Sequence, residues 1–325
     1  MKTFTGKLAV VTGGGTGMGR ELAIQLASQG CAVAICDIAA ERMTETRKLC
    51  IEAGTAETRV TIHECDVADE RQVIAFRDAV AAQHQTDHLN LLFNNAGVGG
   101  GGSFVNGDRG EWERTFGICW GGVYNCTRAF LPMAVASEEA VIVNTSSVNG
   151  FWASIGPATP HTAYSAAKFA VKGFTEALMT DLKVNAPHVK AALVMPGHVG
   201  TEIVANSFRM HGGSDPLEMS SEEVAQLRDR IQQMGMDTAN LDDDVIRQFV
   251  HQQATDFRDK APLSAAAAAT VILEGVRDGH WRILVGKDAA ALDQLVRSDP
   301  ESAYEESFFA RLLKEGHFGP AAGGQ

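Results

Sequence analysis

The sequence predicts an α/β protein built on a doubly wound parallel sheet with helices on both faces. Two observations predict this class. Short apolar runs alternate along the chain with longer segments of helix-like spacing, and turn residues follow each run. In addition, the first run leads into a glycine-rich turn that opens a helix. Strands that alternate with helices in this way form a parallel sheet covered by helices.

About seven of the apolar runs are predicted as strands. They are residues 8–12, 32–36, 60–63, 89–93, 140–143, 190–194 and 282–286. These runs are too short for helices of ordinary length and are rich in β-branched and other apolar residues, as expected of strands buried on both faces. A helix over about residues 264–276 is expected before the seventh strand.

Two stretches do not follow the alternation. Residues 202–262 contain four of the ten methionines and helical patches at 222–233 and 243–253. Because ordinary connections are only a few residues long, we expect this insertion to be a helical lid over a substrate. Residues 288–325 are expected to form a C-terminal extension of one or two helices. The chain shows no repeat or linker, so residues 1–325 are interpreted as a single domain.

The composition argues against several classes of function. The chain has 28 Lys plus Arg and 40 Asp plus Glu, a formal net charge of −12, and an isoelectric point near 5.3. Nucleic acid and anionic membranes attract clustered cations, so neither is an expected partner. No apolar run approaches the roughly 18 residues of a spanning helix, and the N-terminus lacks the apolar stretch of a secretory signal. We therefore expect a cytoplasmic protein.

Metal and disulfide chemistry are not indicated either. The ten histidines include no His-Glu-x-x-His group, and none of the six cysteines forms a Cys-x-x-Cys pair. Six cysteines in 325 residues are also too sparse for a disulfide scaffold. The sequence thus predicts no metal site and reduced, mostly buried thiols.

The glycine-rich turn after the first strand runs Thr12-Gly13-Gly14-Gly15-Thr16-Gly17-Met18-Gly19. Glycine lets the backbone approach a pyrophosphate closely, and the amides and dipole at a helix start attract that anion. A plain strand-to-helix connection can also look like this. Asp37, at the end of the second strand, favours a dinucleotide, because its carboxylate can accept hydrogen bonds from the adenosine ribose.

Asp37 also bears on which dinucleotide is bound. Its charge would repel a 2′-phosphate, and no Arg or Lys immediately follows it. The sequence therefore favours NAD over NADP as the cofactor.

A second group of residues points to proton transfer. Tyr164 and Lys168 are four residues apart on a predicted helix, so an ammonium can lie near a phenol. A free phenol, with a pKa of about 10, is a poor base at neutral pH. A close ammonium and a cationic nicotinamide ring could together lower that pKa by roughly 2 to 3 units, which requires about 3 to 4 kcal/mol. This spacing alone is a weak signal, because any amphipathic helix can carry it.

Together these motifs resemble those of the short-chain dehydrogenase/reductase family, whose members have a single Rossmann-fold domain. The resemblance covers roughly two thirds of the chain, from Lys7 to about Thr201 and again near the seventh strand. It rests on Thr12-Gly-x-x-x-Gly17-x-Gly19, Asp37, Asp66-Val67, Asn94-Asn95-Ala96-Gly97, Ser147, Tyr164-x-x-x-Lys168 and Pro196-Gly197-x-Val199-x-Thr201.

The resemblance implies a catalytic role for three residues. Ser147 would hydrogen-bond the substrate oxygen and Tyr164 would transfer the proton. Lys168 would bind the nicotinamide ribose and lower the tyrosine pKa. Ser147 is preferred to Ser146 because it directly precedes residues 148–150, as in the family pattern, and Ser146 is then expected to make a strand-end hydrogen bond.

The resemblance also implies which residues hold the cofactor. Asp66 and Val67 would contact the adenine, and Val199 and Thr201 would hold the nicotinamide carboxamide. The full predicted set is Gly13, Thr16, Gly17, Met18, Gly19, Asp37, Asp66, Val67, Asn94, Ala96, Gly97, Tyr164, Lys168, Pro196, Gly197, Val199 and Thr201.

The segment between the serine and the tyrosine is longer than is usual in the family. Because residues 151–161 border the reacting carbon, Phe151, Trp152 and His161 are candidates for the substrate wall, as is Phe208 of the lid. Trp152 fits plain packing equally well. A methionine-rich lid favours a bulky apolar substrate, whether aromatic, terpenoid or steroidal.

One position departs from the family pattern. The helix before Leu131-Pro132 normally carries an Asn that organises a water in the proton relay, and Cys119 occupies that position. A thiol is a weak donor and acceptor and is not expected to replace a carboxamide bond for bond. Asn125 lies nearly two turns further on and is not expected to substitute without a helix distortion. The relay is thus left open.

The sequence predicts an NAD-dependent oxidoreductase that interconverts a secondary alcohol and a ketone. One alternative is an NADPH-linked ketoreductase, which Asp37 disfavours. The other is a catalytically weak cofactor-binding sensor or scaffold, which only Cys119 suggests. By analogy with the family, we expect a homodimer or homotetramer that binds a small-molecule substrate.

Overall fold

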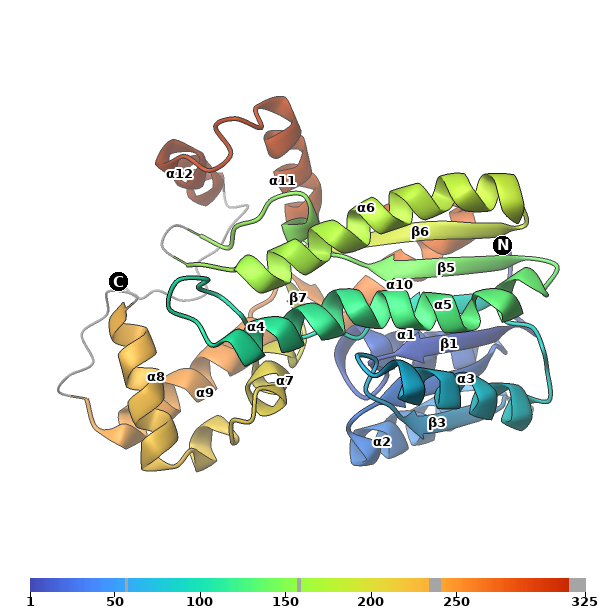
Figure 1. Cartoon of the computed structure of the whole chain (residues 1–325), viewed down its shortest axis with the longest axis horizontal. Helices are drawn as coiled ribbons and strands as arrows, with labels where there is room; N and C mark the ends of the chain where they lie inside the picture. Colours follow the sequence, from blue (N-terminus) through green and yellow to red (C-terminus); the bar gives the residue numbers. More distant parts are fainter. Residues whose placement is uncertain (56–57, 157–158, 234–240, 316–325) are drawn as a thin grey trace.

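The structure is a computed structural model that describes residues 1–55, 58–156, 159–233 and 241–315. Within these residues, seven parallel strands form the main sheet in the order β3-β2-β1-β4-β5-β6-β9 (Figure 1). Their bounds are β1 (Leu8–Thr12), β2 (Ala32–Asp37), β3 (Val60–Glu64), β4 (Leu91–Asn94), β5 (Ala140–Thr145), β6 (Val189–Pro196) and β9 (Arg282–Val285). The predicted doubly wound parallel sheet is confirmed.

Helices cover both faces because successive strand residues are apolar. In β1, Ala9 and Val11 join a core cluster with α1, α2 and α10, whereas Leu8 and Val10 join a cluster with α3, α5 and α6. These strands are thus buried on both faces, as parallel strands usually are. The helices are α1 (Gly17–Ser28), α2 (Ala40–Ala53), α3 (Glu70–His84), α5 (Gly122–Val135), α6 (Thr162–Asn185) and α10 (Ala265–Asp278).

The strand order reverses beside β1. The chain runs outward from β1 to β3 on one side of the sheet, and from β4 to β9 on the other. Open α/β sheets bind their ligands at the carboxyl ends of the strands where the order reverses. The predicted site residues follow the carboxyl ends of β1 to β6, so the fold gathers them at one edge.

The predicted lid and extension are helical and lie beyond the same end of the sheet, at the left of Figure 1. The lid segment holds α7 (Ile203–Met210), a 3-10 turn (Pro216–Glu218), α8 (Ser221–Gln233) and α9 (Asp243–Asp259). The extension holds α11 (Lys287–Ser298) and α12 (Glu306–Lys314). Met234, Met236 and residues 316–325 of these predictions lie outside the described residues.

A two-stranded parallel sheet that the sequence did not predict closes the base of the lid segment. Val199 and Gly200 form β7, Leu263 and Ser264 form β8, and the two strands pair directly. This pairing brings the two ends of the lid segment together.

Candidate active site

The glycine turn between β1 and α1 has a backbone that only glycine suits. Gly13 and Gly17 have φ angles of 66° and 54°, in the left-handed region. A Cβ on Gly19 would collide with the carbonyl oxygen of Gly13. Thr16 precedes α1 without a side-chain hydrogen bond to its first turn, so those amides can serve a ligand. The turn therefore fits a pyrophosphate group.

Asp37, the last residue of β2, faces this turn. Its Oδ2 accepts a hydrogen bond from the Gly15 backbone N–H at 3.0 Å, and its Oδ1 accepts one from the Ala39 N–H at 3.1 Å. Helix α2 brings Arg42 to the same place. A Cβ on Gly15 would lie 2.9 Å from Asp37 Oδ2 and 3.4 Å from Arg42 Cβ. Arg42 does not follow Asp37 directly in the sequence, and it reaches the glycine turn only because it lies in the first turn of α2.

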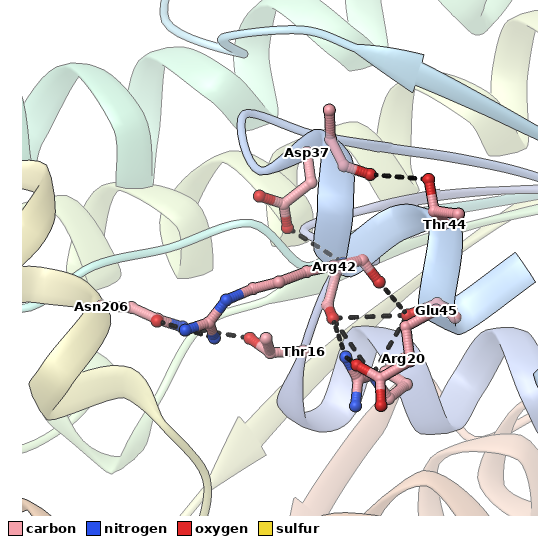
Figure 2. A network of polar contacts seen from close by, with 10 residues as sticks. Thr16, Arg20, Asp37, Arg42, Thr44, Glu45 and Asn206 are labelled. Carbon is pink, nitrogen blue, oxygen red and sulfur yellow. Dashed lines mark hydrogen bonds and ion pairs between the residues drawn. The ribbon is translucent and has the colours of Figure 1, made fainter.

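The lid reaches the glycine turn through α7 (Figure 2). Asn206 Nδ2 donates a hydrogen bond to Thr16 Oγ1 at 3.0 Å, and Arg42 Nη1 donates one to Asn206 Oδ1 at 3.3 Å. A cavity of about 440 Å³ lies between α2 and the lid. Its charged lining residues are Arg20, Arg42, Arg209, Arg258, Glu45, Glu202 and Asp215. Within the described residues, Arg42 is the one arginine of this group without an ion pair.

Asp66 and Val67 follow β3. Asp66 Oδ1 accepts a hydrogen bond from the Ala68 N–H at 3.0 Å, and Arg114 Nη2 lies 3.4 Å from Asp66 Oδ2. Val67 is buried, and its Cγ2 lies 2.6 Å from where a Cβ on Gly122 would be. This close approach explains the glycine at position 122.

Asn94 takes part in a buried polar ladder. Its Nδ2 donates hydrogen bonds to Thr127 Oγ1 at 2.9 Å and to Asn144 Oδ1 at 2.8 Å, and Asn144 Nδ2 donates one to Thr175 Oγ1 at 2.9 Å. Its side chain therefore ties β4 to β5 and α5.

Ala96 and Gly97 lie nearer to the reactive groups. The Ala96 N–H donates to Thr12 Oγ1 at 3.0 Å. A Cβ on Gly97 would be 3.5 Å from Lys168 Nζ and 3.7 Å from Cys119 Sγ. The absence of a side chain at Gly97 thus leaves room beside the lysine.

The three predicted catalytic residues meet at the carboxyl end of β5. The Ser147 side chain lies close enough to the Tyr164 hydroxyl to lower the tyrosine pKa. Lys168 is 2% exposed, and its Nζ lies 5.3 Å from the centroid of the Tyr164 ring and donates a hydrogen bond to the Thr145 carbonyl at 2.9 Å. Ser146 instead donates to the Lys168 carbonyl at 2.8 Å, the strand-end contact expected for it.

The surroundings of Tyr164 shift its pKa in opposing directions. Desolvation by the surrounding protein raises the pKa, and this is the largest effect. The Lys168 ammonium lowers it, Cys119 raises it, and the net pKa lies above the ordinary value. Lys168 therefore acts in the predicted direction, but without the positive charge of a nicotinamide ring it does not outweigh burial.

The sequence profile of the short chain dehydrogenase family matches residues 7–212. The chain belongs to this family. It is 34% identical over 297 residues to a Mycobacterium tuberculosis protein named "Putative oxidoreductase SadH", a match that covers 91% of this chain and 92% of that protein. Human epidermal retinol dehydrogenase 2 is 31% identical over 62% of each chain.

Among solved structures, this short-chain dehydrogenase is similar to a short chain dehydrogenase/reductase from Burkholderia phymatum in complex with NAD. The TM-score is 0.73 at 28% identity, and the match covers 93% of this chain and 96% of that one. The similarity thus extends well beyond the residues that the family profile matches.

Cys119, the departure from the family pattern, lies in a π-helical turn. Residues Gly117–Gly121 form this turn between α4 (Arg109–Phe116) and α5. The thiol donates to the Val98 carbonyl at 3.2 Å and accepts from the Val98 N–H at 3.5 Å. The thiol thus makes two polar contacts, both with the backbone of Val98. Asn125 binds elsewhere and donates to the Val67 carbonyl at 3.0 Å.

The segment after β6 is held by β9 and by the start of the C-terminal extension, which the sequence did not predict. Pro196 ends β6, the Gly197 N–H donates to the Val285 carbonyl at 3.0 Å, and the His198 N–H donates to Asp288 Oδ2 at 2.7 Å. A Cβ on Gly197 would collide with the Asp288 carboxylate. The sequence offered no signal for Asp288, which lies at the start of the extension.

Val199 and Thr201 lead from this segment into the lid. Val199 is buried and pairs with Leu263 in the small sheet. Thr201 Cγ2 lies 3.1 Å from where a Cβ on Gly17 would be. The base of the lid therefore touches the glycine turn.

The four candidates for the substrate wall lie in different surroundings. The His161 ring lies 4.8 Å from that of Tyr164 between centroids and is tilted against it by 38°, and burial lowers the His161 pKa to about 4. Phe151 lies 5.9 Å from the Arg282 guanidinium, and Phe208 packs in the core of the lid. Trp152 is fully buried among residues of the extension. Of the four, His161 is thus the one seen in contact with Tyr164.

Two features are absent from the described part of the chain. No three His, Cys, Asp or Glu side chains there lie close enough together to hold a metal ion. None of its helices has both the length and the apolar character needed to span a membrane.

Proposed function

We propose that this short-chain dehydrogenase interconverts a secondary alcohol and a ketone with NAD as cofactor. The observation that carries the proposal is the grouping of Ser147, Tyr164 and Lys168 at the strand ends that also present the glycine turn. The oxidoreductase and the retinol dehydrogenase among its relatives support alcohol chemistry. The backbone amides of the turn and the Asp37 carboxylate beside it suit a dinucleotide.

Each of the three residues has a distinct role in this proposal. The nicotinamide ring supplies the acceptor or donor of the hydride. Tyr164 removes the hydroxyl proton during oxidation and returns it during reduction. Ser147 donates a hydrogen bond to the substrate oxygen. Lys168 binds the nicotinamide ribose and favours the phenolate through its charge.

The substrate is proposed to be bulky and apolar. Phe208, Met219 and Val224 belong to an apolar cluster of the lid segment, and this segment lies beyond the carboxyl ends of the strands (Figure 1). An aromatic, terpenoid or steroidal alcohol suits such a cover. A homodimer or homotetramer in the cytoplasm remains part of the proposal.

A specific observation favours a second cofactor. Arg42 has no ion pair within the described residues and borders the same turn as Asp37. A guanidinium in this place can neutralise a 2′-phosphate, which supports use of NADP as the alternative. Asp37 lies nearer to the turn and already binds its backbone, so NAD remains the first choice.

The test is a panel of secondary alcohols and ketones, assayed with each dinucleotide by the absorbance of the reduced nicotinamide. The proposal expects NAD-dependent turnover that Tyr164→Phe abolishes while dinucleotide binding persists. A chain that binds NAD but turns over no alcohol or ketone would instead support the sensor or scaffold alternative.

A further inference from the structure

The C-terminal extension packs against the segment that follows Ser147. Trp152, in that segment, is the largest fully buried side chain among the described residues. Its ring centroid lies 5.8 Å from that of Phe308 and 5.4 Å from that of Phe309. These contacts form a core cluster separate from the cores of the sheet and of the lid. The apolar environment of Trp152 is thus supplied largely by the extension.

Two hydrogen bonds give this contact a defined geometry. Trp152 Nε1 donates to the Ala303 carbonyl at 2.7 Å. The Ala153 N–H donates to the Tyr304 hydroxyl at 3.1 Å. Successive residues of the extension therefore bind successive residues of the segment, through one side-chain donor and one side-chain acceptor.

A third residue connects this contact to the serine. Asn149 Nδ2 donates to the Trp152 carbonyl at 3.1 Å and to the Ser154 carbonyl at 2.7 Å. The backbone N–H of Asn149 donates to Ser147 Oγ at 3.1 Å. Asn149 is buried, so these bonds are shielded from water. A continuous chain of contacts thus runs from the extension to the serine hydroxyl.

The extension is itself anchored to the sheet. Asp293 of α11 is 8% exposed and accepts hydrogen bonds from Arg282 of β9 and from Arg297. These arginines hold the pKa of Asp293 below its ordinary value, although burial acts against them. Asp288, near the start of the same helix, accepts a hydrogen bond from the His198 N–H. Helix α11 is therefore fixed to the sheet, and the part of the extension that follows it is held in place through α11.

We propose that residues 299–314 act as a brace that sets substrate selectivity, with Trp152 and Tyr304 as its positioning residues. The brace holds residues 147–156 in one arrangement and so defines the wall beside the reacting oxygen. This inference rests on the proposed function, because it takes the substrate to bind beside Ser147. A bulky alcohol touches that wall. If the brace is weakened, the wall becomes mobile, and binding of the bulky alcohol then includes the entropic cost of ordering it. A small alcohol does not reach it.

The test uses Tyr304→Phe, which removes a single hydroxyl from a ring that is 55% exposed. Tyr124→Phe on α5 is the matched control, because that ring is 47% exposed and lies on another face. The substrates are cyclohexanol and decahydro-2-naphthol with NAD. Backbone hydrogen exchange of residues 147–156 is measured in the same proteins.

In Tyr304→Phe we expect KM for decahydro-2-naphthol to rise about fivefold, the factor of one lost neutral hydrogen bond. KM for cyclohexanol and kcat for both alcohols should change less than about twofold, a split that general destabilisation would not produce. Hydrogen exchange in residues 147–156 should become faster. The control Tyr124→Phe should leave the kinetic constants and the exchange rates at the parent values. Trp152→Phe, which keeps an aromatic ring but loses the N–H, should act in the same direction.

The brace is overturned by equal changes for the two alcohols, or by unchanged exchange in residues 147–156. If the parent turned over no alcohol at all, the proposed function would fail. The exchange measurement would still decide whether the extension holds the segment, so the two failures are distinguishable.

Discussion

The two sides of the candidate site are held in different ways. On the sheet side, Ser147 and Lys168 are 7% and 2% exposed. Ser147 lies just after β5, and Lys168 lies in α6, which packs on the main sheet. On the covering side, α7 contributes no buried residue, and it is joined to the sheet side by polar contacts such as those of Asn206 with Thr16 and of Ser207 with Gly99. We infer that chemistry depends on the sheet side and substrate affinity on the covering side.

The largest expected effect comes from Tyr164→Phe on the sheet side. Loss of a general acid–base group should lower kcat by about 10²–10⁴-fold, whereas the dissociation constant of NAD should hardly change because the ring is kept. Stopped-flow or steady-state turnover and NAD titration measure the two quantities. Substantial residual turnover would show that another group transfers the proton, and would contradict the inference that the chemistry depends on the sheet side.

Asp37→Ala tests the proposed cofactor preference, which also depends on the sheet side. Hydrogen bonds to charged groups contribute about 1.5–3 kcal/mol, so NAD affinity should fall by at least about tenfold. NADP should bind better relative to NAD, because Arg42 remains and the opposing charge is gone. The double variant with Arg42→Ala should lose this gain. An unchanged NAD to NADP ratio in the single variant would contradict the role of Asp37.

The pH dependence sharpens the comparison. Desolvation raises the pKa of Tyr164, so the phenolate needed for alcohol oxidation forms only as the pH rises toward that pKa. Below it, kcat/KM for oxidation should rise about tenfold per pH unit. The reductive rate needs the protonated phenol and should fall above the pKa. A variant without the lid should show the same rising limb, since the titrating group lies on the sheet side.

That variant replaces residues 205–258 with a short Gly/Ser linker. The small β7–β8 sheet lies outside the replaced stretch, and the buried apolar residues of the lid pack mainly with one another. Loop closure entropy grows slowly with length, so the sheet should fold. KM for bulky alcohols should rise by about tenfold, the loss of roughly 50–60 Å² of apolar contact at about 25 cal/mol per Å². Failure to fold, seen by circular dichroism, would show that the lid is structural.

The smallest effect is expected for Asn206→Ala. It removes the two contacts that join α7 to Thr16 and Arg42. The bond to Thr16 is neutral and that from Arg42 is charged, and such bonds contribute about 0.5–1.5 and about 1.5–3 kcal/mol, so KM for NAD should rise at least about threefold with kcat unchanged. Asn106→Ala, in an exposed turn away from these contacts, is the control. Equal effects of the two substitutions would remove the link between lid and cofactor.

The same division explains what the sequence could predict. The strand ends and the glycine turn depend on local chain geometry, which repeats in Rossmann-like sheets, so the fold was predictable, whereas the assignment of Tyr164 and Lys168 came from the resemblance to the family. Arg42, Asp288 and the partners of Trp152 depend on contacts between distant segments. No periodicity records such contacts. The π-helical turn at Cys119 was equally hidden, since its hydrogen bonds differ from those of an α-helix by one residue.

The hydrogen bond between Trp152 and Ala303 joins residues 151 positions apart, which has a consequence for biosynthesis. The chain is synthesised from the N-terminus onward, so β1 to β6 and α6 are made before the partners of Trp152 exist. Until then a large apolar ring next to Ser147 has no cover and is open to chaperones or to other nascent chains. In refolding, we expect far-ultraviolet circular dichroism to recover first and selective turnover to follow only when α12 docks.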